Sequence, residues 1–148
     1  MIGKKYYIWL SLLLALFIFR VVSQFIQSDS QLELSYLPKF DEWQGSTLSY
    51  PILLVAQIFV IICLIVVIAR VRKDNFKPAV WKYRSCLILG SIYFLVMTFR
   101  LMGGQTILSE YQWFAKPIPA FFHIILASFI LIFGWYLRAL YFRQCRKT

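Results

Sequence analysis

Four long apolar stretches occupy most of this chain, and their lengths restrict what it can fold into. They cover residues 6–26, 51–69, 85–104 and 118–137. A helix needs about 20 consecutive apolar residues to cross the hydrocarbon core of a bilayer. Unpaired backbone groups cannot face lipid, and these runs do not alternate as barrel strands do. The sequence therefore predicts an all-α, multi-pass integral membrane protein with four transmembrane helices.

Little of the chain remains for anything else. Of its 148 residues 61% are hydrophobic, so a soluble domain is not expected, and residues 1–148 are predicted to form one integral membrane domain. The first span follows Lys4 and Lys5, as a signal peptide would. However, its apolar region is long, Arg20 interrupts it, and no small-residue cleavage site follows, so we interpret it as a helix.

The net charge of +10 is distributed unevenly along the chain. Residues 70–84 and the C-terminal tail are rich in lysine and arginine, whereas the first outer loop is acidic. Its acidic residues are Asp29, Glu33, Asp41 and Glu42. Cytoplasmic flanks of membrane helices carry an excess of lysine and arginine. This pattern predicts an antiparallel bundle with both termini in the cytoplasm, and it argues against a nucleic-acid partner.

Two tandem helical hairpins are a further interpretation. Three pairs of residues recur with one separation in the second and fourth spans, namely Pro51 with Pro117, Gln57 with His123, and Arg72 with Arg138. Arg20 and Arg100 correspond in the same way in the first and third spans. Internal duplication is common in membrane proteins. Proline at a helix start and arginine at its cytoplasmic end are also generic features, which leaves chance as the rival explanation.

Polar residues interrupt all four spans at a similar depth. With the predicted topology they form one layer in the outer half of the membrane. The members of this polar layer are Arg20, Gln24, Gln57, Arg100, Gln105 and His123. A charge inside a span costs a few kcal/mol or more unless it finds a partner, water or a headgroup.

Two arginines so close together require anions or water. Glu33, Asp41 and Glu42 of the first outer loop are candidates for folding back onto them. Otherwise the anion belongs to a ligand, because a guanidinium grips a carboxylate or phosphate with two parallel hydrogen bonds. That ligand would be a lipid, a quinone or another amphiphile with its head in the layer. Snorkelling to the interface and contact with a partner subunit are the alternative explanations.

Two further features bear on packing. Small residues in the third and fourth spans favour close contacts between helices, namely Gly90, Ser91, Ala127, Ser128 and Gly134. The first outer loop carries Trp43 and is expected to lie on the membrane surface or to cover the polar layer.

Reaction motifs are not evident. His123 is the sole histidine, which excludes a bis-histidine haem within one chain, and no cysteine–histidine set has metal-ligand spacing. Glycine-rich phosphate loops and nucleophile turns are missing, and no span carries a carboxylate. The sequence therefore argues against an enzyme. It assigns no catalytic residue, no metal site and no cofactor, with a lipid or quinone left open as a bound ligand.

Three functional hypotheses follow. The first is an accessory subunit of a larger membrane complex, whose polar layer contacts lipid or a partner. Its partners would be membrane lipids and other membrane protein subunits or further copies of itself. The second is a lipid- or quinone-binding protein, including a small membrane enzyme, and the third is a carrier for an anionic amphiphile. In the last two, Arg20, Arg100 and His123 would surround the ligand's head.

Overall fold

The computed structural model describes residues 3–28, 36–43, 49–77, 79–106, 110–111 and 114–146. These residues form α1 (Gly3–Ser28), α2 (Phe40–Trp43), α3 (Tyr50–Arg72), α4 (Val80–Gly103) and α5 (Pro117–Cys145). Within this part of the chain four helices, all but α2, are long and apolar enough to cross a membrane. The prediction of an all-helical protein with four long apolar helices is therefore confirmed for the described residues.

The helices begin and end where the sequence changes character. Each long helix has between 23 and 29 residues, more than the roughly 20 that a crossing requires. Pro51 and Pro117 occupy the first turns of α3 and α5, where the amide proton that proline lacks has no helical partner. Helix α3 stops at Arg72, and two residues later Asp74 has a φ of 48°, which turns the chain toward α4.

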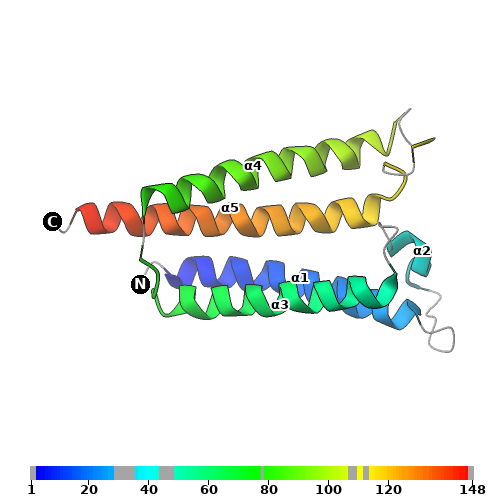
Figure 1. The fold of residues 1–148 in the computed structure, drawn as a ribbon, viewed down its shortest axis with the longest axis horizontal. Helices are drawn as coiled ribbons and strands as arrows, with labels where there is room; N and C mark the ends of the chain where they lie inside the picture. Colours follow the sequence, from blue (N-terminus) through cyan, green and yellow to red (C-terminus); the bar gives the residue numbers. More distant parts are fainter. Residues whose placement is uncertain are drawn as a thin grey trace.

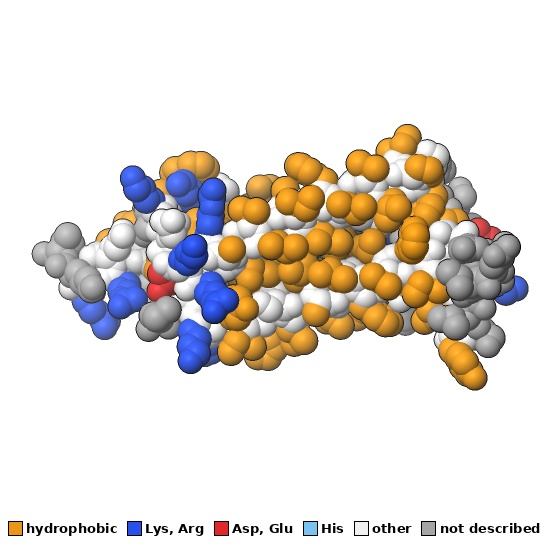
Figure 2. Space-filling view, turned by 90° about the horizontal axis from the view of Figure 1, so that it is seen from below, with side chains coloured by type: hydrophobic (Ala, Val, Ile, Leu, Met, Phe, Trp, Pro, Cys, Tyr) orange, Lys and Arg blue, Asp and Glu red, His pale blue; other side chains and the backbone are white. Residues whose placement is uncertain are grey.

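The long helices lie alongside one another (Figure 1). Both chain termini and the connection between α3 and α4 lie at the same end, which we call the terminal end. Helix α2 lies at the other end. In Figure 2 most of the visible lysine and arginine side chains gather at the terminal end, and apolar side chains cover the middle of the molecule. This separation agrees with the uneven distribution of charge along the sequence.

The order of neighbours leaves one side open. Helix α1 packs against both α3 and α5, and α4 packs against α5. Among the described residues, no Cα atom of α3 lies within 8 Å of α4 or α5. The helices therefore follow the order α3, α1, α5, α4. The members of each sequential hairpin are neighbours, but the contact of α1 with α5 has no counterpart between α4 and α3. A two-fold repeat of the hairpins would require that counterpart.

Close approach of α4 and α5 depends on two glycines. A Cβ atom added at Gly90 would lie 3.0 Å from Leu131 Cδ2, and one added at Gly134 would lie 3.0 Å from Leu87 Cδ2. Each glycine thus accommodates a leucine of the other helix. The predicted close contact is confirmed at Gly90 and Gly134, whereas Ser91 is exposed. The two glycines bring the backbones near each other as small residues do in membrane interfaces.

A carboxylate holds the terminal end together. Asp74 Oδ1 accepts hydrogen bonds from the Gly3 backbone amide at 3.1 Å and from the Tyr136 hydroxyl at 3.3 Å. Gly3 is the first residue of α1, so the carboxylate also faces the positive end of that helix dipole. Asp74 therefore connects the start of α1 to α5.

Replacing Asp74 by alanine is expected to lower the free energy of unfolding by about 1–3 kcal/mol, because a buried hydroxyl and a helix-terminal amide lose their acceptor. Asp74→Asn keeps a carbonyl acceptor and tolerates positive φ, so it should retain most of the stability. Thermal unfolding of both variants in detergent tests the difference. Equal midpoints for the two would show that the hydrogen bonds of Asp74 contribute nothing.

Candidate functional site

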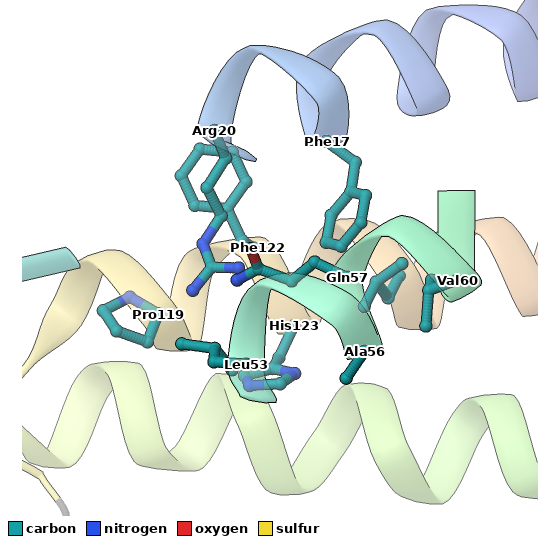
Figure 3. Close-up of a pocket in the computed structure, with 10 residues that line it drawn as sticks. Phe17, Arg20, Leu53, Ala56, Gln57, Val60, Pro119, Phe122 and His123 are labelled. Atoms are coloured by element: carbon teal, nitrogen blue, oxygen red, sulfur yellow. The ribbon is translucent and has the colours of Figure 1, made fainter. Parts of the chain in front are cut away.

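A crevice of about 140 Å³ lies between α1, α3 and α5, in the half of the molecule away from the terminal end (Figure 3). Its polar lining consists of Arg20, Gln57 and His123, one from each helix. The rest of the lining is apolar and includes Phe17 and Phe122. The Arg20 and Gln57 side chains are only 7% and 5% exposed. The crevice is thus an apolar space into which three helices each bring one polar group.

The Arg20 side chain is held by contacts of its guanidinium group, whereas its Nε is unpartnered in the described residues. Its Nη2 donates a long hydrogen bond of 3.4 Å to the Trp43 carbonyl oxygen, and its guanidinium carbon lies 5.5 Å from the centre of the Phe122 ring. The buried Nε has no hydrogen-bond partner in the described part of the chain. A buried guanidinium with a free N–H retains the capacity to bind an acceptor.

Trp43 lies next to Arg20 and Phe122, two residues that line the crevice. Its side chain is 4% exposed and packs against Phe122, with 6.1 Å between ring centres. The indole N–H donates to the Pro38 carbonyl oxygen at 3.0 Å, which holds the ring in place. The α2 segment of the first outer loop therefore contacts Arg20 of the polar layer.

The two glutamines pair across α1 and α3. Gln57 Nε2 donates to Gln24 Oε1 at 3.1 Å, and both side chains are buried. The other amide atoms, Gln24 Nε2 and Gln57 Oε1, have no partner among the residues that the structure describes. An unsatisfied buried amide group costs about 1–3 kcal/mol. Together with Arg20 Nε, these atoms form a cluster of unused donors and an acceptor.

His123 joins the crevice to α4. Its Nδ1 is hydrogen-bonded to the Tyr93 hydroxyl at 2.6 Å, and Figure 3 shows its ring on the α4 side of the crevice. Arg100 is 5% exposed and lies two helical turns beyond Tyr93, on the same face of α4. Tyr93 was not predicted to belong to the polar layer. Its spacing from Arg100 is the sequence feature that indicates its place there.

The predicted layer is thus assembled in part. Arg20, Gln57 and His123 line the crevice, Gln24 is bonded to Gln57, and Arg100 is buried on the face of α4 that carries Tyr93. Gln105 lies apart, because it follows the end of α4 in a turn and its side chain is exposed.

The acidic candidates that the structure describes do not supply an anion to Arg20. Asp41 and Glu42 are exposed, and Arg20 donates to a backbone carbonyl beside them instead. Glu33 lies outside the described residues. No carboxylate lines the crevice within the described part of the chain. The site therefore presents a buried positive charge, free amide groups and an imidazole, which suit a ligand rich in hydrogen-bond acceptors.

Comparison of the chain with known protein families, curated proteins and solved structures found no match. The fold and the crevice define the class, a multi-pass helical membrane protein with a polar crevice among its helices.

Proposed function

We propose that this is an antiparallel transmembrane bundle, with both termini in the cytoplasm, that binds the head of an anionic or carbonyl-bearing amphiphile in the outer half of the membrane. A lipid and a quinone are the two ligand classes that this chemistry fits. The observation that carries the proposal is the buried Arg20 guanidinium, whose Nε is unused, in a crevice that is also lined by Gln57, whose Oε1 is unused.

The dimensions of the crevice support a headgroup rather than a whole ligand. Sites that enclose a drug-sized molecule have volumes of about 300 Å³ or more. At about 140 Å³, this crevice accommodates a phosphate, a carboxylate or a quinone ring. The tail would then lie along the open side of the bundle, where α3 does not approach α4 or α5 in the described residues. Aliphatic side chains such as Leu53 and Val60 line that route.

Substituting Gln57 by leucine tests this proposal. Leucine has a similar volume but offers no hydrogen bond, so retention of the native ligand should fall about tenfold. Protein extracted gently from its host would be analysed by native mass spectrometry for bound small molecules. Gln105→Leu is the matched control, since it makes the same change in an exposed side chain outside the crevice. Equal ligand retention by the two variants would contradict the proposal.

An accessory subunit of a larger membrane complex is the second candidate. Helices α3 and α4 carry long series of exposed apolar side chains, among them Val55, Phe59, Leu89 and Leu95. Such faces suit contact with another membrane protein as well as with lipid. The same mass spectrometry separates the candidates, because a subunit would retain a protein partner at fixed stoichiometry and a binding protein would retain only a small molecule.

A further inference from the structure

A second cavity, of about 450 Å³, lies at the terminal end of the molecule. Its walls come from the end of α3, the connection to α4, the start of α4 and one face of α5. Three cations line it: Arg70 from α3, Lys77 from the connection and Lys82 from α4. Cations from three separate segments therefore converge on one space.

The acidic residue of the connection between α3 and α4 has its hydrogen bonds outside this cavity. Asp74 belongs to the same connection, but its Oδ1 accepts from the Gly3 amide and the Tyr136 hydroxyl. No carboxylate lines the cavity in the described part of the chain. The positive flank of a membrane helix explains why cations occur at this end. It does not explain why they surround one cavity from which the neighbouring carboxylate is withdrawn.

Apart from the cations, Asn75 and Ser85, the lining is apolar. Phe76 packs against Phe133 with 5.2 Å between ring centres, and Leu137 lies one turn further along α5. At the rim, Lys82 Nζ lies 5.8 Å from the centre of the Trp81 ring and within 3.5 Å of the Lys77 carbonyl oxygen. The cavity thus has a charged rim over an apolar floor, as a site for an amphiphile requires.

The two cavities belong to opposite halves of the membrane. His123 in the crevice and Leu137 in this cavity are separated by about 21 Å along α5, at 1.5 Å rise per residue. The hydrocarbon core is about 30 Å thick. A ligand in the terminal-end cavity would therefore belong to the other leaflet, and its site is independent of the proposed function of the crevice.

We propose that this cavity binds an anionic glycerophospholipid of the leaflet at the terminal end. Its phosphate lies among Arg70, Lys77 and Lys82, and its acyl chains lie against Phe133 and Leu137 where α3 stands apart from α4. Charge complementarity selects this occupant over a zwitterionic lipid. Juxtamembrane lysines and arginines attract anionic headgroups in this way, and here three of them act on a single site.

Trp81, which lines the cavity at its rim, provides a reporter. The full-length protein would be placed in nanodiscs of phosphatidylcholine containing increasing amounts of phosphatidylglycerol with brominated acyl chains, which quench nearby indoles. Subtracting the signal of a Trp81→Phe variant isolates the response of Trp81 from that of the other tryptophans. Brominated phosphatidylcholine at the same mole fractions measures unselective contact.

The decisive comparison uses two triple variants. Arg70→Gln, Lys77→Gln and Lys82→Gln together remove the cavity's cations. Lys4→Gln, Lys5→Gln and Arg143→Gln together remove the same charge from exposed positions at the same end, outside the cavity. We expect the first variant to need about tenfold more phosphatidylglycerol for half-maximal quenching, and the second to resemble the wild type.

Two results would overturn the proposal. Equal shifts for the two triple variants would show that only the general surface charge attracts the lipid. Equal quenching of the wild type by brominated phosphatidylglycerol and phosphatidylcholine would show that the cavity does not select for charge.

Discussion

Replacing Arg20 by methionine is expected to abolish retention of the ligand in the crevice while leaving the stability of the ligand-free protein unchanged or raised. Arg20 is 7% exposed, its Nε is unpartnered within the described residues, and its bond to the Trp43 carbonyl oxygen is long at 3.4 Å. A buried cation held so weakly is destabilising to the fold, since replacement of buried charges by apolar residues of similar volume is often neutral or stabilising.

The size of the binding effect follows from the charge. Hydrogen bonds to charged groups contribute about 1.5–3 kcal/mol each, so losing the guanidinium should weaken binding of an anionic head by on the order of a hundredfold. Methionine is flexible and apolar, so it fills the space beside Phe17 and Phe122, and the Trp43 carbonyl oxygen loses only a long hydrogen bond.

Two measurements on one preparation test this prediction. Native mass spectrometry reports ligand retention, and thermal unfolding after removal of lipid reports the stability of the fold alone. Arg138→Met is the control, because it makes the same substitution in an exposed arginine at the terminal end of α5. A large loss of stability with unchanged ligand retention would show that Arg20 is a structural residue and that the ligand does not bind in the crevice.

Replacing Gly90 by leucine is expected to produce the largest loss of stability among single substitutions in α4. A Cβ atom at this position already lies 3.0 Å from Leu131 Cδ2 and 3.2 Å from Ile130 Cγ2, so a full leucine side chain must push α4 away from α5. Overpacking a tight interface costs about 1–3 kcal/mol, and occasionally more. The change would also separate Tyr93 from His123, which these two helices bring together.

The neighbouring residue supplies the control. Ser91 is exposed, so Ser91→Leu adds comparable bulk on the same helix without entering the contact. It should alter the free energy of unfolding by less than about 0.5 kcal/mol. Gly90→Ala should fall between the two, because the end of the Leu131 side chain can move and alanine favours the helix by about 1 kcal/mol. If Ser91→Leu proves as destabilising as Gly90→Leu, the glycine contact does not hold the helices together.

Local sequence was sufficient for the helices themselves. Each apolar run is long enough to cross a bilayer, and a chain in lipid must satisfy its backbone hydrogen bonds within each helix. The helix starts at Pro51 and Pro117 were visible for the same local reason, although the helices generally extend beyond the predicted spans. The approximate depth of Arg20, Gln57 and His123 followed from counting residues along each helix.

Which helices pack together and which side chains pair could be determined only from the tertiary structure. Lipid is as apolar as leucine, so hydrophobicity does not select which helices pack, and close fitting at residues such as Gly90 and Gly134 selects them instead. That fitting sets the rotation of each helix, and rotation determines which polar atoms meet.

The polar layer illustrates which features follow from the sequence and which from the tertiary structure. The sequence by itself determined the four helices and the level at which their polar residues lie, because both depend on distances along one helix. Only the tertiary structure paired Gln24 with Gln57, bonded His123 to Tyr93 and left Gln105 in an exposed turn. It also decided that a backbone carbonyl, rather than a carboxylate, meets Arg20. These outcomes depend on contacts between elements distant in the chain, which no local pattern encodes.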